Sequence, residues 1–209
     1  MKKLIIKENQ KKVLLLENFE TTNIHFKKNS SANIFAIIKD GWTKEKKLNF
    51  YFEGQNSKLT FICIFIGTKK EKFIFQTNSY HDSKHTQAHY YINSLLQDKS
   101  SIDYQGNIII RPGAQNTDTY LSHNTLLLSD YAKAQTTPSL EIEANKIKAS
   151  HSATIGKIDE ELLFYLKSKG IKEKNAKQLL VKAFLMKDIK KLNNKSTQKL
   201  IIQKIEASI

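Results

Sequence analysis

Residues 113–171 are the part of the chain that decides the fold. Residues 113–117 read Gly-Ala-Gln-Asn-Thr, residues 126–129 read Leu-Leu-Leu-Ser, and residues 138–142 read Pro-Ser-Leu-Glu-Ile. Ser-His-Ser-Ala-Thr follows at 150–154, then Leu-Phe-Tyr-Leu at 163–166 and Ser-Lys-Gly-Ile at 168–171. Up to Gly156 the apolar runs are short and separated by turn residues, and after it their spacing becomes helical. The stretch therefore predicts a β-rich body followed by helices.

The strand-and-turn pattern extends back to the start of the chain. Short runs rich in Ile, Phe, Tyr and Leu alternate with Gly, Asn, Asp or Ser, and no helical period of comparable strength links them. The expected strands cover residues 12–16, 34–38, 48–52, 59–66, 72–75, 89–92, 107–110, 126–128, 140–143 and 147–149. Such a series suits a sandwich, a barrel or a solenoid, and no exact sequence repeat selects among them.

Composition indicates a soluble globular protein. The chain has 209 residues, of which 40% are hydrophobic and 26% charged, enough for one long domain or one domain with an appendage. The longest apolar run, residues 61–66, is too short to cross a bilayer, and only three apolar residues precede Lys7, too few for a secretory signal. We therefore expect a cytoplasmic protein with no membrane contact.

A single cysteine, Cys63, excludes an internal disulfide and a self-contained four-cysteine cluster site. Because it lies within an apolar run, we expect it to be a small buried hydrophobic residue.

The net charge of +14 raises the question of nucleic acid binding. Arg111 is the only arginine, which leaves 33 lysines. Base recognition and stacking favour the planar guanidinium group, which this chain almost lacks, so we expect no specific nucleic acid partner. A lysine-rich RNA- or anion-binding β-rich module stays open as an alternative function.

Residues 157–209 predict a helical region. Asp159 can cap a helix that begins with Glu160 and Glu161, and Gly170 occupies the position expected just after its end. Leu162, Leu163, Tyr165 and Leu166 supply its apolar stripe, and a second helix places Ala176, Leu179, Leu180, Ala183 and Phe184 on one face. Ser196 or Thr197 is the expected cap of a third helix. We divide the chain into a β-helix core, residues 1–156, and a C-terminal helical region, residues 157–209.

In this order and at this spacing, the quoted stretch resembles the SufB/SufD family, the β-helical scaffold proteins of bacterial and plastid iron–sulfur cluster assembly. The resemblance covers residues 76–189 and is most specific from 113 to 171. It implies a right-handed parallel β-helix, in which each coil stacks its apolar side chains on the next, followed by a small C-terminal α-helical region. It also implies a SufD-like, non-catalytic scaffold subunit of the SufBCD complex.

The resemblance singles out His151 and its neighbour Ser150. It implies that this histidine lies at the interface with a SufB-like subunit, facing a cysteine of that partner, where an iron–sulfur cluster assembles. Imidazole is a suitable iron ligand, so His151 is the candidate metal ligand for a transient cluster or iron, with no permanently bound cofactor expected. The sequence departs from the family pattern at Ala149, where the family has cysteine, and at Ser152, where it has glycine. A histidine at a coil corner, bonded to its Ser and Thr neighbours, is the alternative interpretation.

His123 is a second interface candidate, since it falls about where the SufB branch has its cluster-assembly cysteine. The alternative is an exposed turn histidine. His81, His85 and His89 recur at a spacing that would suggest zinc on a helix, but the segment reads better as a turn that enters a strand, which separates them.

The resemblance also implies a SufC-like ABC ATPase as partner, bound through the C-terminal helices. The expected docking residues are Leu163, Tyr165, Leu166, Leu179, Leu180 and Phe184. The chain has no Gly-Lys-Ser/Thr phosphate loop and no Gly-x-Ser-x-Gly motif, so any driven step needs a partner's energy. A heterodimer with SufB is expected, and a homodimer stays open.

Overall fold

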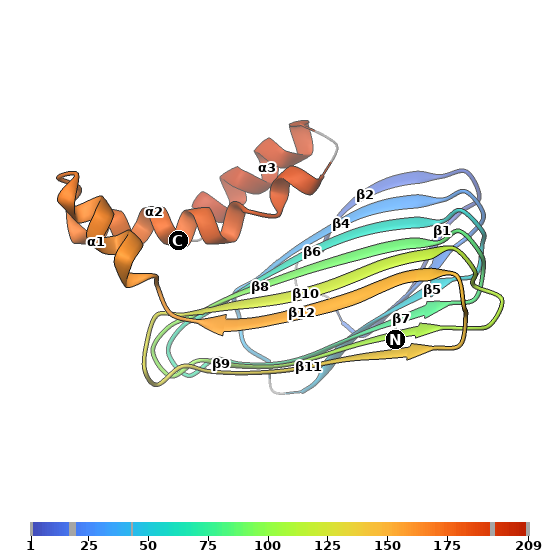
Figure 1. Ribbon diagram of the computed structural model, residues 1–209, viewed down its shortest axis with the longest axis horizontal. Coiled ribbons are helices and arrows are strands. Elements are labelled where there is room, and N and C mark those ends of the chain that lie inside the picture. Colours follow the sequence, from blue (N-terminus) through green and yellow to red (C-terminus); the bar gives the residue numbers. More distant parts are fainter. Residues whose placement is uncertain (1, 17–19, 43, 193–194, 208–209) are drawn as a thin grey trace.

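The computed structural model describes residues 2–16, 20–42, 44–192 and 195–207, and it consists of two parallel sheets wound into a solenoid (Figure 1). The odd-numbered strands form one sheet, in the order β1 (Lys2–Ile6), β3 (Thr22–Phe26), β5 (Lys46–Phe52), β7 (Lys72–His81), β9 (Ser101–Ile110) and β11 (Lys133–Ile142). The even-numbered strands form the other, in the order β12 (Ile147–Gly156), β10 (Thr117–Leu127), β8 (Gln87–Leu96), β6 (Lys58–Gly67), β4 (Ser31–Ile38) and β2 (Lys11–Leu16). We call them the odd sheet and the even sheet. One strand of each makes a coil, and the predicted parallel β-helix is confirmed.

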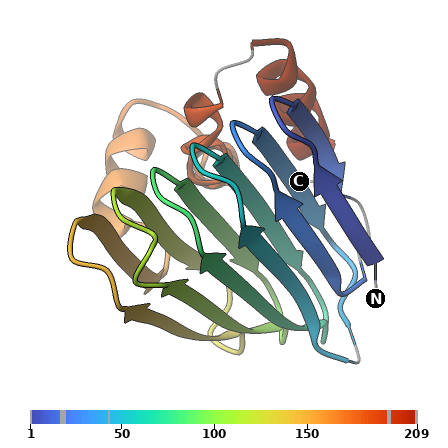
Figure 2. The same ribbon diagram turned by 90° about the vertical axis from the view of Figure 1, so that its right-hand side faces the viewer.

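Apolar side chains fill the space between the two sheets. Alternate residues of each strand point inward, and parallel pairing places each above its partner on the adjacent coil. Figure 2 shows the coils stacked side by side. Phe26, Phe52 and His81 form one such stack, with ring centroids 4.7 Å and then 4.5 Å apart. Cys63 is fully buried in the same core, as predicted.

The turns at one side of the solenoid repeat the same conformation. The left-handed residues Asn9, Asn29, Asn56, His85 and Asn116 have φ between 55° and 60°. Asparagine tolerates this region better than most residues, and its short amide can bond to the next coil. Asn56 donates to the Oδ1 of Asn29, and Asn29 donates to that of Asn9, each at 3.0 Å.

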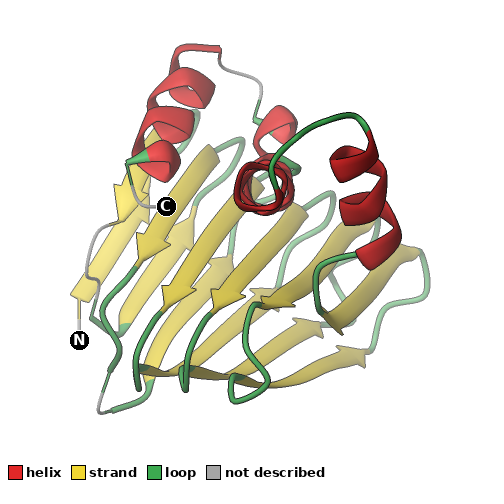
Figure 3. Cartoon of the chain, turned by 90° about the vertical axis from the view of Figure 1, so that its left-hand side faces the viewer, coloured by secondary structure: helices red, strands yellow, loops and turns green. Residues whose placement is uncertain are grey.

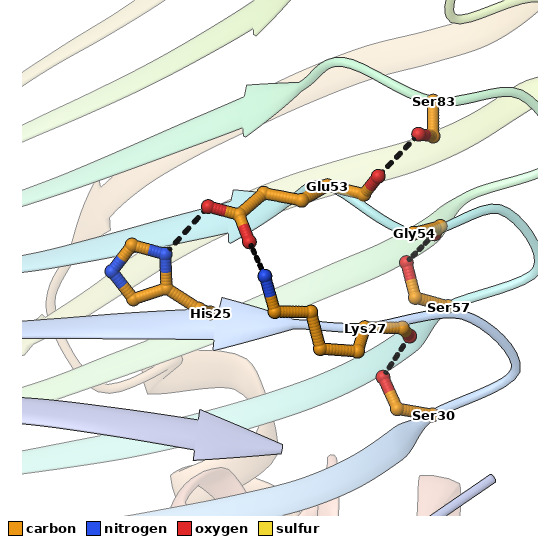
Figure 4. A network of polar contacts seen from close by, with 7 residues as sticks. All are labelled: His25, Lys27, Ser30, Glu53, Gly54, Ser57 and Ser83. Atoms are coloured by element: carbon orange, nitrogen blue, oxygen red, sulfur yellow. Dashed lines mark hydrogen bonds and ion pairs between the residues drawn. The ribbon is translucent and has the colours of Figure 1, made fainter. Parts of the chain in front are cut away.

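A serine follows two of these turn residues and closes each turn. Ser30 donates to the carbonyl of Lys27 at 2.6 Å, and Ser57 donates to that of Gly54 at 2.7 Å (Figure 4). Beside them Glu53 accepts from the ammonium group of Lys27 at 2.6 Å and lies 2.8 Å from Nδ1 of His25. The serine bonds lie within single turns, whereas the contacts of Glu53 join successive coils.

All ten predicted strands overlap strands of the structure, each of which is longer than predicted, and β1 and β3 were missed. The longest strand, β10, has eleven residues. Most of its residues before Leu126 are polar, so a search for apolar runs identifies only its end as a strand. Its polar residues are tolerated because neighbouring coils supply hydrogen-bond partners inside the solenoid.

Three α-helices and a short 3₁₀-helix follow the last strand: α1 (Glu160–Ser168), α2 (Glu173–Met186), η1 (Ile189–Lys191) and α3 (Lys195–Glu206). Asp159 accepts from the backbone N–H of Leu162 at 3.0 Å, and Gly170 has φ of +85°, so both predicted caps of α1 are confirmed. The cap predicted for the third helix is wrong, because Ser196 and Thr197 lie inside the first turn of α3.

Helices α2 and α3 lie over the outer face of the even sheet, and α1 packs against α2 (Figure 3). Val181 and Leu185 of α2, with Ile201 and Ile205 of α3, are buried in a second apolar cluster. That cluster also contains outward-facing strand residues, among them Phe35, Ile62, Ile64 and Tyr91. In the described part of the chain, no helix has the length and apolar character needed to cross a bilayer.

Candidate functional site

The coil formed by β11 and β12 ends the solenoid and leaves two strand edges open. Within the described residues β11 pairs with β9 alone and β12 with β10 alone, and each strand has ten residues (Figure 2). Unpaired backbone groups along such edges can pair with another chain.

The backbone of β12 offers alternate residues to that edge. The N–H of Asp118 bonds to the carbonyl of Thr86, so the even-numbered residues of β10 bond toward β8 and the odd-numbered ones toward β12. By the register of β10 with β12, the backbone groups of His151 and Ala153 therefore face the open edge. From 149 to 156, β12 has no Asp, Glu, Lys, Arg or Pro, the residues that usually protect an edge.

The neighbouring edge of β11 is protected. The N–H of Lys133 bonds to the carbonyl of Ser100, so the odd-numbered residues of β11 bond toward β9 and Pro138 faces the open side. Pro138 lies inside β11, and its missing N–H costs no hydrogen bond within the sheet. Of the two edges, β12 is the better template for a partner strand.

His151 lies in the middle of β12. It pairs in register with Leu121, a residue of the apolar core, so the alternation of the strand places its imidazole on the inward-facing side. The ring is nevertheless exposed, because no further coil covers it in the described part of the chain. The interpretation as a coil-corner histidine is therefore wrong: His151 presents an accessible imidazole at the end of the solenoid.

The neighbours of His151 lie on both sides of the strand. Ser150 is exposed on the outward side, in register with Tyr120. The hydroxyl of Ser152 lies 2.9 Å from that of Tyr120 and ties the strand to β10. Ala149 is half-buried against the core and brings no thiolate.

His123 is placed differently from the prediction. It lies within β10 and not in a turn, and its side chain is 1% exposed. Its Nε2 lies 2.8 Å from the hydroxyl of Ser94 and its Nδ1 2.7 Å from that of Thr136. Burial lowers the pKa of His123 to about 3, which keeps the ring neutral at neutral pH. Ala153 of the last coil lies in register above it, so His123 is separated from the open end.

The three histidines spaced by four residues do not form a metal site. His81 ends β7 inside the solenoid and lies 2.9 Å from the hydroxyl of Ser79, His85 occupies a turn, and His89 faces outward 3.4 Å from Asp118. A turn that enters a strand is confirmed. Nowhere among the described residues do three or more His, Cys, Asp or Glu side chains lie where they could hold a metal ion.

The predicted docking residues on the helices fall into two groups. Leu163 is buried, and Leu166, Leu180 and Phe184 are half-buried, so they contribute to packing. Tyr165 and Leu179 are 54% and 49% exposed. The predicted apolar stripes are wrong in part, since α2 buries Val181 and Leu185 against the sheet and leaves Leu179 outside.

Sequence reasoning missed the most exposed large hydrophobic residue of these helices, Phe164, at 73%. Phe164 is an aromatic residue outside the predicted apolar stripe of this helix, and this position could have indicated an exposed contact residue. A groove of about 1210 Å³ lies between the ends of β8 and β10 and the helices. Leu128, Ile158, Ile171 and Leu179 contribute to its wall.

Comparison with known proteins matches this architecture. The model of the family described as "SUF system FeS cluster assembly, SufBD core domain" covers residues 6–184. The iron–sulfur cluster assembly protein SufD of Escherichia coli is 26% identical over 191 residues, which are 91% of this chain and 45% of that protein. SufD of Bacillus subtilis is 26% identical over 83% of this chain and 40% of its own length.

A SufBD family protein of Pyrococcus horikoshii is 42% identical over 99 residues, 46% of this chain and 22% of that protein. The chain thus spans less than half the length of these relatives. The family model covers most of the chain, from the last residue of β1 into α2, and leaves out η1 and α3. The chain belongs to the SufBD family of the SUF iron–sulfur cluster assembly system.

Proposed function

We propose that this chain is a SufD-like, non-catalytic scaffold subunit for iron–sulfur cluster assembly. It pairs with a SufB-like subunit through the open coil and binds a SufC-like ABC ATPase through its C-terminal helices. The relatives named SufD and the family model support this role.

The unprotected edge of β12 is the observation that carries the proposal. Ten residues of strand lie open at the end of a rigid solenoid, and the stretch 149–156 lacks the charges and proline that would discourage pairing. Ile142 and Ile155 are 43% and 46% exposed at the same end and can be covered by an added subunit. A second SufBD-type β-helix supplies an edge of the same kind, which also accommodates a homodimer.

His151 is the residue we assign to the cluster cargo. Its imidazole is exposed at the edge where the partner would join, so a ligand from the partner can complete the coordination of iron or of a nascent cluster. Because position 149 is alanine, the thiolate ligands must come from the partner. The cluster is a transient cargo in this proposal and not a resident cofactor.

The helices α1 and α2 provide the surface for the ATPase. Phe164, Tyr165 and Leu179 expose large apolar groups at the end of the molecule that holds the groove between sheet and helices. A partner that docks on α1 and α2 would cover these exposed side chains.

Co-purification with SufB-like and SufC-like proteins tests both interfaces. Ala153→Pro removes an N–H that faces the open edge, so it should reduce SufB capture by roughly tenfold or more while the solenoid unfolds at nearly the same temperature. Ala153→Ser is the matched control and should bind as the native chain does. Retention of SufB by the proline variant would contradict the edge assignment.

A further inference from the structure

A second site lies on the outer face of the even sheet, away from the open coil. It is a groove of about 730 Å³ over the first residues of β2, β4, β6 and β8. Its basic lining residues are Lys11, Lys12, Lys58, Lys191 and His89. Among the residues that the structure describes, no aspartate or glutamate lines it. The volume is that of a small-molecule site, which usually measures roughly 300–1,000 Å³.

The strand register builds the cationic side of the groove. Lys11 pairs with Ser31, and Ser31 pairs with Lys58, so the two lysines stand on either side of one serine. Strands lie roughly 4.8 Å apart, which places the two lysine backbones roughly 10 Å from each other. Lys12 pairs in register with the core residue Ala32, so the alternation of β2 places its side chain on the inward side. Within the described residues no carboxylate forms an ion pair with Lys11 or Lys58. Their charge is therefore free for a ligand.

Hydrogen-bonding side chains form the floor. Asn33, Thr60 and His89 lie side by side on neighbouring strands, two residues along from the lysine row. Asn29 and Asn56 close one end, where they belong to the stacked turns. Backbone pairing holds all of these positions, so the donors are arranged before a ligand arrives.

A fixed lysine stands on the other side of the groove. The Nζ of Lys191 lies 3.9 Å from the ring centroid of Tyr91 and 3.2 Å from Oδ1 of Asp188. Asp188 is 5% exposed and also accepts from the amide of Asn93 at 2.9 Å. Two carboxylates lie beside the groove, and both already have partners. Asp188 forms an ion pair with Lys191, while Asp118 accepts from the amide of Gln87 at 3.1 Å and lies 3.4 Å from His89.

We propose that this groove binds a compact, multiply charged phosphorylated small molecule. Phosphate oxygens accept several hydrogen bonds and carry the negative charge that Lys11 and Lys58 attract. Lysine serves as a point charge for phosphate, while base readout favours the arginine that this chain almost lacks. The site does not depend on the scaffold function, because it lies on strands far from β12 in the sheet order.

Titration calorimetry of the full chain with inorganic tripolyphosphate tests the site. One ligand should bind per chain, and Lys11→Gln with Lys58→Gln should weaken binding by roughly tenfold or more, because two charge-assisted contacts are lost. The matched control is Lys69→Gln with Lys70→Gln, which removes the same charge from an exposed turn and should retain the native affinity. Equal weakening in both double variants, or no saturable binding, would overturn the proposal.

Two further ligands identify the source of the phosphate. If ADP binds more tightly than tripolyphosphate and the double variant Lys11→Gln with Lys58→Gln loses this binding, the ligand is a nucleotide. If tripolyphosphate binds more tightly than ADP, the ligand is a free phosphate chain. A short single-stranded RNA should bind more weakly and lose affinity steeply with salt. RNA that binds more tightly than either small molecule, and depends on the same lysines, would overturn the small-molecule assignment.

Discussion

The two histidines inside the solenoid should make its stability depend on pH. His81 is fully buried and His123 is 1% exposed, and each ring nitrogen has a hydroxyl partner within 2.9 Å. Burial lowers the pKa of each to about 3, against an ordinary value near 6.5. In the unfolded chain both rings take up a proton as the pH falls through 6.5, while in the folded chain they stay neutral until about pH 3.

The sign and size of the effect follow from linkage. Since the unfolded state binds more protons between these two pKa values, the free energy of unfolding falls as the pH falls. Between pH 7 and pH 5 each histidine removes about 2 kcal/mol, so the pair removes about 4 kcal/mol. Against a typical stability of about 5–15 kcal/mol, this loss is large.

Urea unfolding at pH 7, 6 and 5 measures this slope for the native chain and for four variants, which are two single substitutions, the double variant that combines them, and a control. His81→Gln and His123→Gln each remove one titrating ring, and each should flatten the slope by about 1.4 kcal/mol per pH unit below pH 6.5, whatever they do to stability at pH 7. His151→Gln is the matched control, because His151 is exposed in the folded chain as it is in the unfolded one. An unchanged slope in the double variant of His81 and His123 would refute the assignment of these rings as neutral buried groups.

Three other outcomes are expected. His151→Ala should lower the yield of cluster in a reconstituted complex without dissociating it, measured by iron content and absorbance, and an unchanged yield would make His151 a structural residue. Tyr165→Asp with Leu179→Asp should abolish capture of the SufC-like ATPase while far-ultraviolet circular dichroism is retained, and ATPase binding by this variant would remove the helices from the interface. Phe52→Ala should lower the free energy of unfolding, measured in urea, by about 3–5 kcal/mol, because it interrupts the stack of Phe26, Phe52 and His81. A loss below about 1 kcal/mol would show that the core closes over the cavity.

One repeat was present in the sequence and was overlooked. Four left-handed turn residues are each followed by a hydroxyl residue, in the pairs 29–30, 56–57, 85–86 and 116–117. The pairs recur at intervals of 27 to 31 residues, one coil apart, and the histidine of the pair 85–86 replaces asparagine. Only three of the pairs begin with asparagine, so a search for identical residues does not find the period. A search for turn-forming residues followed by serine or threonine would have indicated the solenoid without the resemblance to a known family.

Local chemistry alone determined ten of the twelve described strands, the caps of α1 and the burial of Cys63. Strand character and helix capping depend on residues within one turn or a few positions of each other, which the linear order displays directly. The local pattern did not predict which face of α2 is buried, because that face depends on contact with the even sheet. Val181 and Leu185 are buried there by contact with strands far away in the sequence.

The tertiary structure alone decided which residues are accessible. Winding the chain places residues 20 to 32 positions apart directly above one another, so burial depends on whether another coil follows. His123 and His151 both point toward the interior of the solenoid, yet one is sealed by Ala153 and the other is exposed on the last coil. The same winding brings Lys11 and Lys58 to opposite sides of Ser31. No local pattern contains this information, because it arises from the number and order of the coils.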